Sequence, residues 1–445
     1  MGEGLGRELA WGQHGGEIPI IIPITKDGTA RKNSRGEDER LSHQDVIEVK
    51  LQEGIDQFCV YGKIRFSDRG VFRMSKLLAE GYDYLRLELH SNRDEGGGYG
   101  KVRKLKMEIL NMTGWEHGHL YGGGYDRVEM IVAQFPAYRN LQVWKVSKGF
   151  SDILISDIVK WIHKNLINQD GKSDKFPYAI QTNAGEDTIE ATSNKMESFS
   201  IPFWSPAKTL NYLKKYALAG SKNAGYHCFF DLDDIFHFQS LQSLMNKGDL
   251  HELELKDIVN ESIQVAQTDT QKIVKEYFPD FAHKEFYKIG LSGASAERFN
   301  WFKKKEYTLK NGYEERPLPE VNRLYEKEEE INNMFGFHIP TGFRGEKDRS
   351  FCTALVYNQL LTAVAAQAQT KIQINGITSD PRMKSGDRVI IKNKVAGLNE
   401  NVEELEGRWF VRGVVHVWNT KGYPYRQTLA LSRVGKFHHE LGGGD

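Results

Sequence analysis

The most informative stretch of the sequence is Trp204–Gly220, WSPAKTLNYLKKYALAG. Ser205 suits a helix N-cap, because its hydroxyl can accept a hydrogen bond from an unpaired N–H group of the first turn. Pro206 suits that first turn, where a missing N–H group is tolerated. Gly220 is a typical residue just past a helix end, so the stretch predicts a helix between these caps. The apolar positions at helical spacing are Leu210, Leu213 and Ala217.

A strand pattern follows this helix. Tyr226–Phe230 and Ile235–Phe238 are short apolar runs separated by Asp231–Asp234, which predicts a β-hairpin. The aspartates superficially resemble the start of a calcium loop, but the glycine and glutamate that complete an EF-hand loop are missing. We therefore interpret Asp231–Asp234 as a turn. Helix and hairpin together predict an α/β helix-hairpin domain over residues 141–250.

A second amphipathic helix is predicted earlier in the same domain. Its N-cap is expected at Ser151. Residues 168–200 show no clear period and predict irregular chain. The apolar residues that recur every four positions, as on one face of a helix, are Leu154, Ile158, Ile162 and Leu166.

Residues 1–140 predict a first β-barrel domain with an N-terminal arm. In Leu85–Leu89 the leucines alternate with charged residues, as in a half-buried strand. Ile18–Ile24 contains two prolines, which suits an extended arm or an edge strand. Short strands joined by glycine-rich turns favour a barrel or a sandwich. The other strands are predicted over Val46–Leu51, Phe58–Phe66, Tyr84–His90, Lys101–Leu110 and Asp126–Gln134.

Residues 349–445 predict a helix, a second β-barrel domain and a C-terminal tail. Arg349–Gln369 is rich in Ala and Gln and reads as the helix. A turn at Ser385–Gly386 precedes one of the strands. The strands are predicted over Lys371–Ile374, Asp387–Lys392, Arg408–Trp418 and Gln427–Ser432.

A charged insert, residues 251–348, separates the helix-hairpin domain from the second barrel. Helices are predicted around Asp257–Phe278 and Leu318–Met334, and the charge run Glu326–Glu330 indicates a solvated helix face. The predicted fold class is therefore α+β. Two small antiparallel, tube-like β-barrel domains flank an α/β helix-hairpin domain, and the insert is charged and partly helical.

Composition excludes some partners. In 445 residues, 60 Lys and Arg balance 60 Asp and Glu, so net charge favours neither nucleic acid nor an anionic membrane. We predict no sequence-specific nucleic-acid binding. The first residues lack the order of a signal peptide, and no apolar run is long enough to span a bilayer. The sequence predicts a soluble protein made in a cytoplasm, without a membrane anchor.

The three cysteines, Cys59, Cys228 and Cys352, lie more than 100 positions apart. An odd number without CxxC spacing argues against a disulfide framework and against a zinc site. We expect buried free thiols.

Candidate catalytic and metal-binding motifs are weak. Glu116–His119 places two histidines on one side of a strand, where a metal could use them, but further ligands are not evident nearby and an exposed hairpin loop explains the stretch. His438 and His439 suit a solvated tail. Ser292–Ser295 lies in a polar stretch, and neither a GxSxG nor an HExxH motif occurs. We assign no catalytic, cofactor-binding or metal-binding residues and expect a protein that is not an enzyme.

The order of these segments resembles the baseplate hub proteins of contractile-tailed bacteriophages, including the T-even hub. It is also similar to the hub part of VgrG-type spikes of type VI secretion systems. The stretches that carry the resemblance are Tyr61–Asp68, Tyr84–Leu89, Ile201–Phe230, Tyr357–Ala368, Met383–Ile391, Phe410–Val417 and Thr428–Leu431.

The resemblance implies a structural role in the virion, at the tail baseplate, with assembly in the host cytoplasm. It implies a homotrimer whose paired barrels form a pseudo-sixfold ring between a threefold central spike and a sixfold tail tube. Other implied partners are a tube-initiator protein, baseplate wedge proteins, and a tape-measure protein that passes through the lumen with DNA. The alternatives are a tail-associated cell-wall hydrolase or protease, and a hub or distal tail protein of another contractile injection system.

Overall fold

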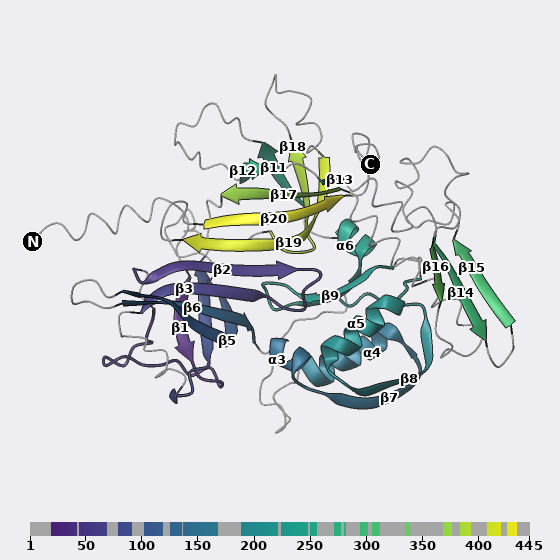
Figure 1. The fold of residues 1–445 in the computed structure, drawn as a ribbon, viewed down its shortest axis with the longest axis horizontal. Coiled ribbons are helices and arrows are strands. Elements are labelled where there is room, and N and C mark those ends of the chain that lie inside the picture. Colours follow the sequence, from purple (N-terminus) through teal and green to yellow (C-terminus); the bar gives the residue numbers. More distant parts are fainter. Residues whose placement is uncertain are drawn as a thin grey trace, which may run out of the picture.

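The computed structural model shows a mainly β protein with few helices (Figure 1). The residues that it describes are 19–41, 44–68, 79–90, 102–118, 125–135, 137–167, 188–220, 224–247, 250–255, 271–276, 280–281, 294–300, 305–311, 335–338, 354, 368–375, 383–392, 407–419 and 425–433.

The first β part is an antiparallel run in the order β1-β4-β5-β6-β3-β2. Its alternating sequences predicted these strands, and β1 lies at the outer edge, as Pro19 and Pro23 indicated. In β3 every second side chain is buried, including Ile64 and Phe66. The strands are β1 Ile20–Ile24, β2 Val46–Gly54, β3 Tyr61–Asp68, β4 Tyr84–His90, β5 Val102–Gly118 and β6 Tyr125–Gln134.

The middle part packs two short helices against a curved two-stranded ribbon (Figure 1). Its apolar core also includes the hairpin β9–β10, which forms the antiparallel pair expected from the sequence. None of the helices that the structure describes is long and apolar enough to cross a membrane. The elements are α3 Ala137–Gln142, β7 Val146–Leu154, α4 Ile155–Ile162, the π-helical turn η1 His163–Ile167, β8 Lys195–Trp204, α5 Pro206–Tyr216, β9 Tyr226–Phe230, β10 Phe236–Ser240 and α6 Leu241–Lys247.

Two helix boundaries differ from the predictions. Ser151 lies inside β7 and α4 begins at Ile155, because the backbone of 146–154 pairs with β8. Helix α5 starts after Ser205 as predicted, with its hydroxyl accepting from the Lys208 N–H at 3.3 Å. It ends at Tyr216 rather than near Gly220, because the Asn194 side chain bonds to the Tyr216 carbonyl and accepts from the Leu218 N–H at 3.2 Å.

The second β part contains strands from three separate stretches of the chain. Its pairings run from β19 through β18, β11, β12 and β17 to β20, and β20 pairs again with β19. A further sheet has the order β15-β14-β16. The strands are β11 Leu250–Leu255, β12 Gln271–Glu276, β13 Asp280–Phe281, β14 Ala294–Asn300, β15 Lys305–Asn311, β16 Phe335–His338, β17 Ala368–Asn375, β18 Arg388–Lys392, β19 Gly407–Asn419 and β20 Tyr425–Arg433.

The prediction of a partly helical insert is wrong for its described residues, which form strands. Within the predicted helix Asp257–Phe278, residues 271–276 form β12. In β11 the alternation of buried and exposed side chains is present, with Leu253 buried and its neighbour Glu252 exposed. The many charged residues of this stretch make that alternation hard to recognise in the sequence. Backbone hydrogen bonds to strands that are distant in the sequence favour the extended conformation, and the local sequence does not show them. The predicted helix Leu318–Met334 lies outside the described residues, as does most of Arg349–Gln369.

The prediction of antiparallel sheets holds for most pairs but not for all of them. β11 runs parallel to both β12 and β18, and β16 runs parallel to β14. Parallel neighbours need long connections rather than tight turns, and the chain supplies these within residues 251–387. Closure of either β part into a barrel remains a prediction.

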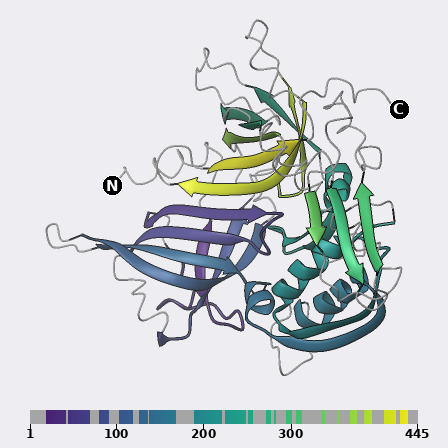
Figure 2. The same ribbon diagram turned by 45° about the vertical axis from the view of Figure 1, so that its right-hand side comes forward.

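The two β parts are joined edge to edge by β2 and β19, so that 13 described strands form one sheet (Figures 1 and 2). The register runs antiparallel from Gly54 opposite Gly413 to Glu48 opposite Asn419. A Cβ atom at Gly413 would lie 3.1 Å from the Glu53 carbonyl oxygen. Glycine at this position therefore permits the close approach of the two strands.

Gly62→Ala should test the packing of the first β part. A Cβ atom at this position in β3 would lie 2.7 Å from Leu51 Cδ2 and 2.8 Å from Val132 Cγ2. Because both neighbours are buried, we expect a loss of about 1–3 kcal/mol in the free energy of unfolding, measured by urea denaturation. Gly114→Ala is the matched control, since nothing lies within 4 Å of its Cβ position. Equal stabilities of the two variants would contradict this packing.

Candidate functional site

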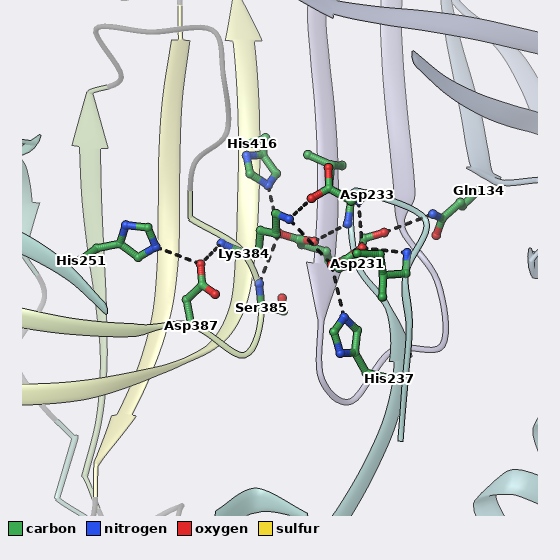
Figure 3. A network of polar contacts seen from close by, with 12 residues as sticks. Gln134, Asp231, Asp233, His237, His251, Lys384, Ser385, Asp387 and His416 are labelled. Carbon is green, nitrogen blue, oxygen red and sulfur yellow. Dashed lines mark hydrogen bonds and ion pairs between the residues drawn. The ribbon is translucent and has the colours of Figure 1, made fainter. Parts of the chain in front are cut away.

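A buried carboxylate lies where the two β parts and the hairpin meet. Glu53, near the end of β2, is 1% exposed. It accepts hydrogen bonds from the Leu232 N–H at 3.0 Å and from the Ser385 N–H at 3.3 Å. Leu232 belongs to the β9–β10 turn and Ser385 to the turn before β18. One carboxylate thus connects three parts of the chain, and we call this region the junction (Figure 3).

His416 of β19 brings a side chain of the second β part to the same carboxylate. Its Nε2 atom lies 3.4 Å from Glu53 Oε1, and its Nδ1 atom lies 2.9 Å from the Tyr425 hydroxyl. An imidazole that donates from Nε2 to the carboxylate can accept from the hydroxyl at Nδ1, so both contacts form in one tautomer. His416 is fully buried, which gives it a structural role at the junction.

Asp231 organises the hairpin turn on the other side of Glu53. Its Oδ1 atom accepts from the Asp233 N–H at 2.8 Å and from the Ile235 N–H at 2.9 Å. Its Oδ2 atom lies 3.2 Å from His237 Nε2. Lys384 of the second β part forms an ion pair with Asp233. The turn predicted from the aspartates is confirmed, and it is anchored to another part of the chain.

Gln134, at the end of β6, ties the first β part to the same turn. Its amide oxygen accepts from the Val60 N–H at 3.1 Å, and its amide nitrogen donates to the Asp231 carbonyl at 3.2 Å and to the Asp234 carboxylate. Burial raises the pKa of Asp234 to about 6, although the hydrogen bond from Gln134 opposes the shift. Asp234 also has a left-handed backbone, with φ 61°.

Two further histidine–carboxylate contacts surround the junction. His251 of β11 lies 3.1 Å from Asp387, which also accepts from the Lys384 N–H at 2.8 Å. Asp56, just past β2, contacts His227 of β9 at 3.3 Å and Arg412 of β19 at 2.7 Å. Burial opposes ionisation of Asp56, but these two contacts outweigh it and hold its pKa well below the usual range. The junction therefore holds the parts of the chain together.

The outward side of the joined sheet forms a second feature, a polar face that crosses from one β part to the other. Lys63 of β3 lies opposite Lys50 of β2, which lies opposite Val417 of β19, and Val417 lies opposite Arg426 of β20. This shared face is defined by Glu48, Lys50, Gln52, Lys63, Arg65, Glu129, Val415, Val417, Arg426 and Thr428.

Opposite charges on the shared face pair with one another. Glu129 of β6 lies 2.9 Å from Lys63 Nζ and 2.8 Å from Arg65 Nε. Lys63 and Arg65 lower the pKa of Glu129, and Glu129 in turn raises the pKa of Arg65. Across β19 and β20 the face carries the smaller side chains Val415 and Thr428. The result is a polar surface on which Glu48 and Glu129 are paired with Arg65 and Lys63.

The side chains of the weak sequence motifs lie outside the part of the chain that the structure describes. Glu116 and His117 lie in β5, with side chains outside the described part, and His119 lies outside it altogether. Ser292 and the two C-terminal histidines also lie outside the described residues. Within the described ranges, no group of three or more His, Cys, Asp and Glu residues is arranged to hold a metal ion.

The expected buried thiols are confirmed for two cysteines. Cys59 and Cys228 are buried and not disulfide-bonded. Burial raises the pKa of the Cys59 thiol to about 12, and it also raises the pKa of Cys228. Such thiols are poor nucleophiles. Cys352 lies outside the described residues.

Sequence reasoning missed the junction, although one signal was present. In β2 the buried positions alternate through Val49, Leu51 and Glu53. A carboxylate in the buried phase of a strand requires hydrogen-bond partners, because an unpaired buried charge is costly. The sequence pattern therefore indicates that Glu53 is buried and needs hydrogen-bond donors from elsewhere in the chain. It does not show that these donors are the N–H groups of Leu232 and Ser385, because both are distant in the sequence.

Glu53→Ala should destabilise the whole chain. The substitution leaves the Leu232 and Ser385 N–H groups buried without an acceptor, and each unsatisfied group costs about 1–3 kcal/mol. We expect a loss of about 2–5 kcal/mol in the free energy of unfolding, measured by urea denaturation. Gln52→Ala, one position away and exposed, should change stability by less than about 0.5 kcal/mol. A Glu53 variant as stable as the Gln52 variant would rule out the junction as a stabilising element.

Asp234→Asn should change how stability depends on pH. The pKa of this carboxyl is raised on folding from 3.8 to about 6, so the folded state binds its proton more tightly. Its contribution therefore destabilises the fold as pH rises from about 4 to about 6. Asparagine keeps the acceptor for Gln134 and tolerates a positive φ. We expect the free energy of unfolding of the variant to exceed that of the unsubstituted protein by about 2–3 kcal/mol at about pH 7, and not to decline over this pH range.

Asp152→Asn is the control for this pH series. Asp152 also has a positive φ, of 47°, but its side chain is 68% exposed. Its urea denaturation profile against pH should follow that of the unsubstituted protein. If stability depends on pH in the same way in the Asp234 variant and in the unsubstituted protein, the raised pKa of Asp234 would be contradicted.

Comparisons with known proteins find structures with a similar fold but no similar sequence. No protein-family model matches the chain, and no curated protein matches its sequence. A tail protein from Neisseria meningitidis MC58 is similar with a TM-score of 0.51 at 9% identity, over 94% of this chain and 98% of that chain. The 43 kDa tail protein of prophage MuSo2 from Shewanella oneidensis is similar with a TM-score of 0.50 at 7% identity, over 93% and 97%. Across nearly its whole length, the chain has the fold of these two tail proteins.

Proposed function

We propose that the protein is a structural component of a phage contractile tail, the hub subunit of its baseplate. The observation that carries this proposal is the edge-to-edge pairing of β2 with β19, which lets one chain present two adjoining β parts with a common outward face. The likeness of the whole chain to two tail proteins supports the same role.

In this proposal the chain has four parts. Residues 1–140 and 349–445 form two tube-like barrel domains, residues 141–250 form the helix-hairpin domain, and residues 251–348 form the insert. The pairing of β20 with both β17 and β19 supports closure of the second barrel. β11 and β12, which come from the insert, add strands to that barrel through β18 and β17.

Three chains would supply six β parts to one ring. Each chain would already hold two of them in a fixed relation, because the junction and the β2–β19 pairing join them. Such a homotrimer has threefold symmetry, and its ring is pseudo-sixfold. It could therefore meet a threefold central spike on one side and a sixfold tail tube on the other.

The shared face suits the lumen of such a ring. Its acidic side chains at Glu129 and Glu48 contact Arg65, and Glu129 also contacts Lys63. Pairing of this kind reduces the attraction of the surface for a passing polyanion or polypeptide. DNA and a tape-measure protein could then move through without lasting contacts.

The proposed partners are the spike, the tail tube or a tube-initiator protein, and baseplate wedge proteins, and the proposed location is the virion tail. A hub of another contractile injection system, or a distal tail protein, is the alternative that shares this fold. A tail-associated hydrolase or protease is the other alternative. It is less favoured, because His416, which contacts the buried carboxylate of Glu53, is itself fully buried and out of reach of a substrate.

Mass photometry of the full chain, alone and with the spike protein encoded beside it, tests the assembly. We expect a complex of about 153 kDa, three times the 50.9 kDa of one chain. Leu110, 37% exposed on β5, is an outward apolar residue suited to a subunit contact. Leu110→Glu should abolish the trimer while leaving the thermal unfolding temperature nearly unchanged.

Thr113→Glu, an exposed change on the same strand β5, is the matched control and should leave the trimer intact. A chain that stays at 50.9 kDa even with its spike protein would overturn the hub proposal. Loss of the trimer in the control as well would show that any added charge on this strand disrupts assembly, and the contact at Leu110 would be withdrawn.

A further inference from the structure

An exposed apolar patch lies on the middle part, away from the shared face. Val143 and Trp144 lie in the connection between α3 and β7, and they are 59% and 36% exposed. Phe203, near the end of β8, is 64% exposed. The register brings these residues together, since Val146 pairs with Trp204 and the Lys145 ammonium lies 5.7 Å from the Phe203 ring centroid. We call Val143, Trp144 and Phe203 the apolar patch.

The backbone at Phe203 is strained. Its φ is +53°, a region that bulky side chains rarely adopt. Such a conformation costs on the order of 1–3 kcal/mol. Burial cannot account for it, because most of the Phe203 ring is exposed. The strained backbone instead displays the ring at the surface, which is the arrangement expected of a binding residue.

The surroundings of the apolar patch are basic. Residues 137–151 and 198–230 contain neither Asp nor Glu, although the chain as a whole is neutral. Helix α5 begins just after the patch and has no acidic residue in its first turn, so the positive end of its dipole is not neutralised locally. Of the lysines in these two stretches, Lys145 lies over the Phe203 ring and Lys208 lies over the ring of the adjacent Trp204.

We propose that the apolar patch docks an acidic segment of another protein, in which large apolar side chains are flanked by Asp and Glu. The apolar side chains would cover Trp144 and Phe203, and the carboxylates would meet the lysines around them. Burial of aromatic anchors inside a charged rim is the usual arrangement of a binding site.

Single-stranded nucleic acid is the rival occupant, because it also binds aromatic and basic surfaces. The geometry favours a polypeptide. The Lys145 ammonium lies over the Phe203 ring, and the Lys208 ammonium lies 4.7 Å from the Trp204 ring centroid. These lysines occupy ring faces on which a base would stack. Val143, which is aliphatic and highly exposed, suits an apolar side chain better than a base.

The test is fluorescence polarisation of a short labelled peptide, with Leu and Phe residues flanked by Asp and Glu, titrated with the full chain. We expect saturable binding that weakens about tenfold or more in Trp144→Ser and in Phe203→Gly. Lys145→Gln combined with Lys208→Gln should weaken binding and reduce its dependence on salt. Phe203→Gly should unfold at the same temperature or higher, because glycine accepts the positive φ.

The controls separate this surface from others on the molecule. Ile131→Ser removes an exposed apolar side chain from β6, and Lys104→Gln removes a lysine of β5 that is 62% exposed. Both should bind the peptide like the unsubstituted chain. A peptide with Ser in place of Leu and Phe should bind about tenfold more weakly.

Three outcomes would overturn the proposal. The first is the absence of saturable peptide binding. The second is tighter binding of oligothymidine than of the acidic peptide, lost in the same variants, which would make the surface a nucleic-acid site. The third is self-association of the chain that Trp144→Ser abolishes, which would make the patch a contact between copies. This test is independent of the hub proposal, because it requires neither a trimer nor a spike.

Discussion

The buried carboxylate of Glu53 is the interaction on which the rest of the arrangement depends. A charge this deeply buried is tolerated only when donors surround it. Its donors, the N–H groups of Leu232 and Ser385, lie 179 and 332 positions away along the chain. They reach it only when the hairpin and the second β part are in place. The hydrogen-bonding need of one side chain therefore connects three parts of the chain.

The pairing of β2 with β19 carries this connection into the sheet. Two glycines face each other at one end of the pairing, and the glycine of β19 leaves room for the backbone of β2. The core of the first β part is completed by Leu232, Trp418 and Tyr425, which come from the hairpin and from the second β part. A shared core and a shared sheet make the two β parts a single surface, and the proposed ring requires such a surface.

Local patterns predicted those elements whose stabilising contacts are close in sequence. Ser205 caps α5 as expected, β9 pairs with β10, and β1, which contains Pro23, lies at an edge. The errors occurred where distant residues decide the outcome. Ser151, predicted to be a helix cap, is a strand residue because its segment pairs with β8. Helix α5 ends before Gly220 because the Asn194 side chain bonds to the Tyr216 carbonyl. Strands such as β12 were read as helix because their partners lie far along the chain.

By itself the sequence determined which faces of the strands are buried, where most of the turns lie and that the chain has two β-rich ends. These properties follow from side-chain period and turn chemistry, which act over a few residues. Only the tertiary structure decided that β2 pairs with β19, that Glu53 contacts His416 at a separation of 363 positions, and that Phe203 is displayed on a strained backbone. Alternation shows which side chains face inward, but it does not specify which distant strand accepts the hydrogen bonds of an edge.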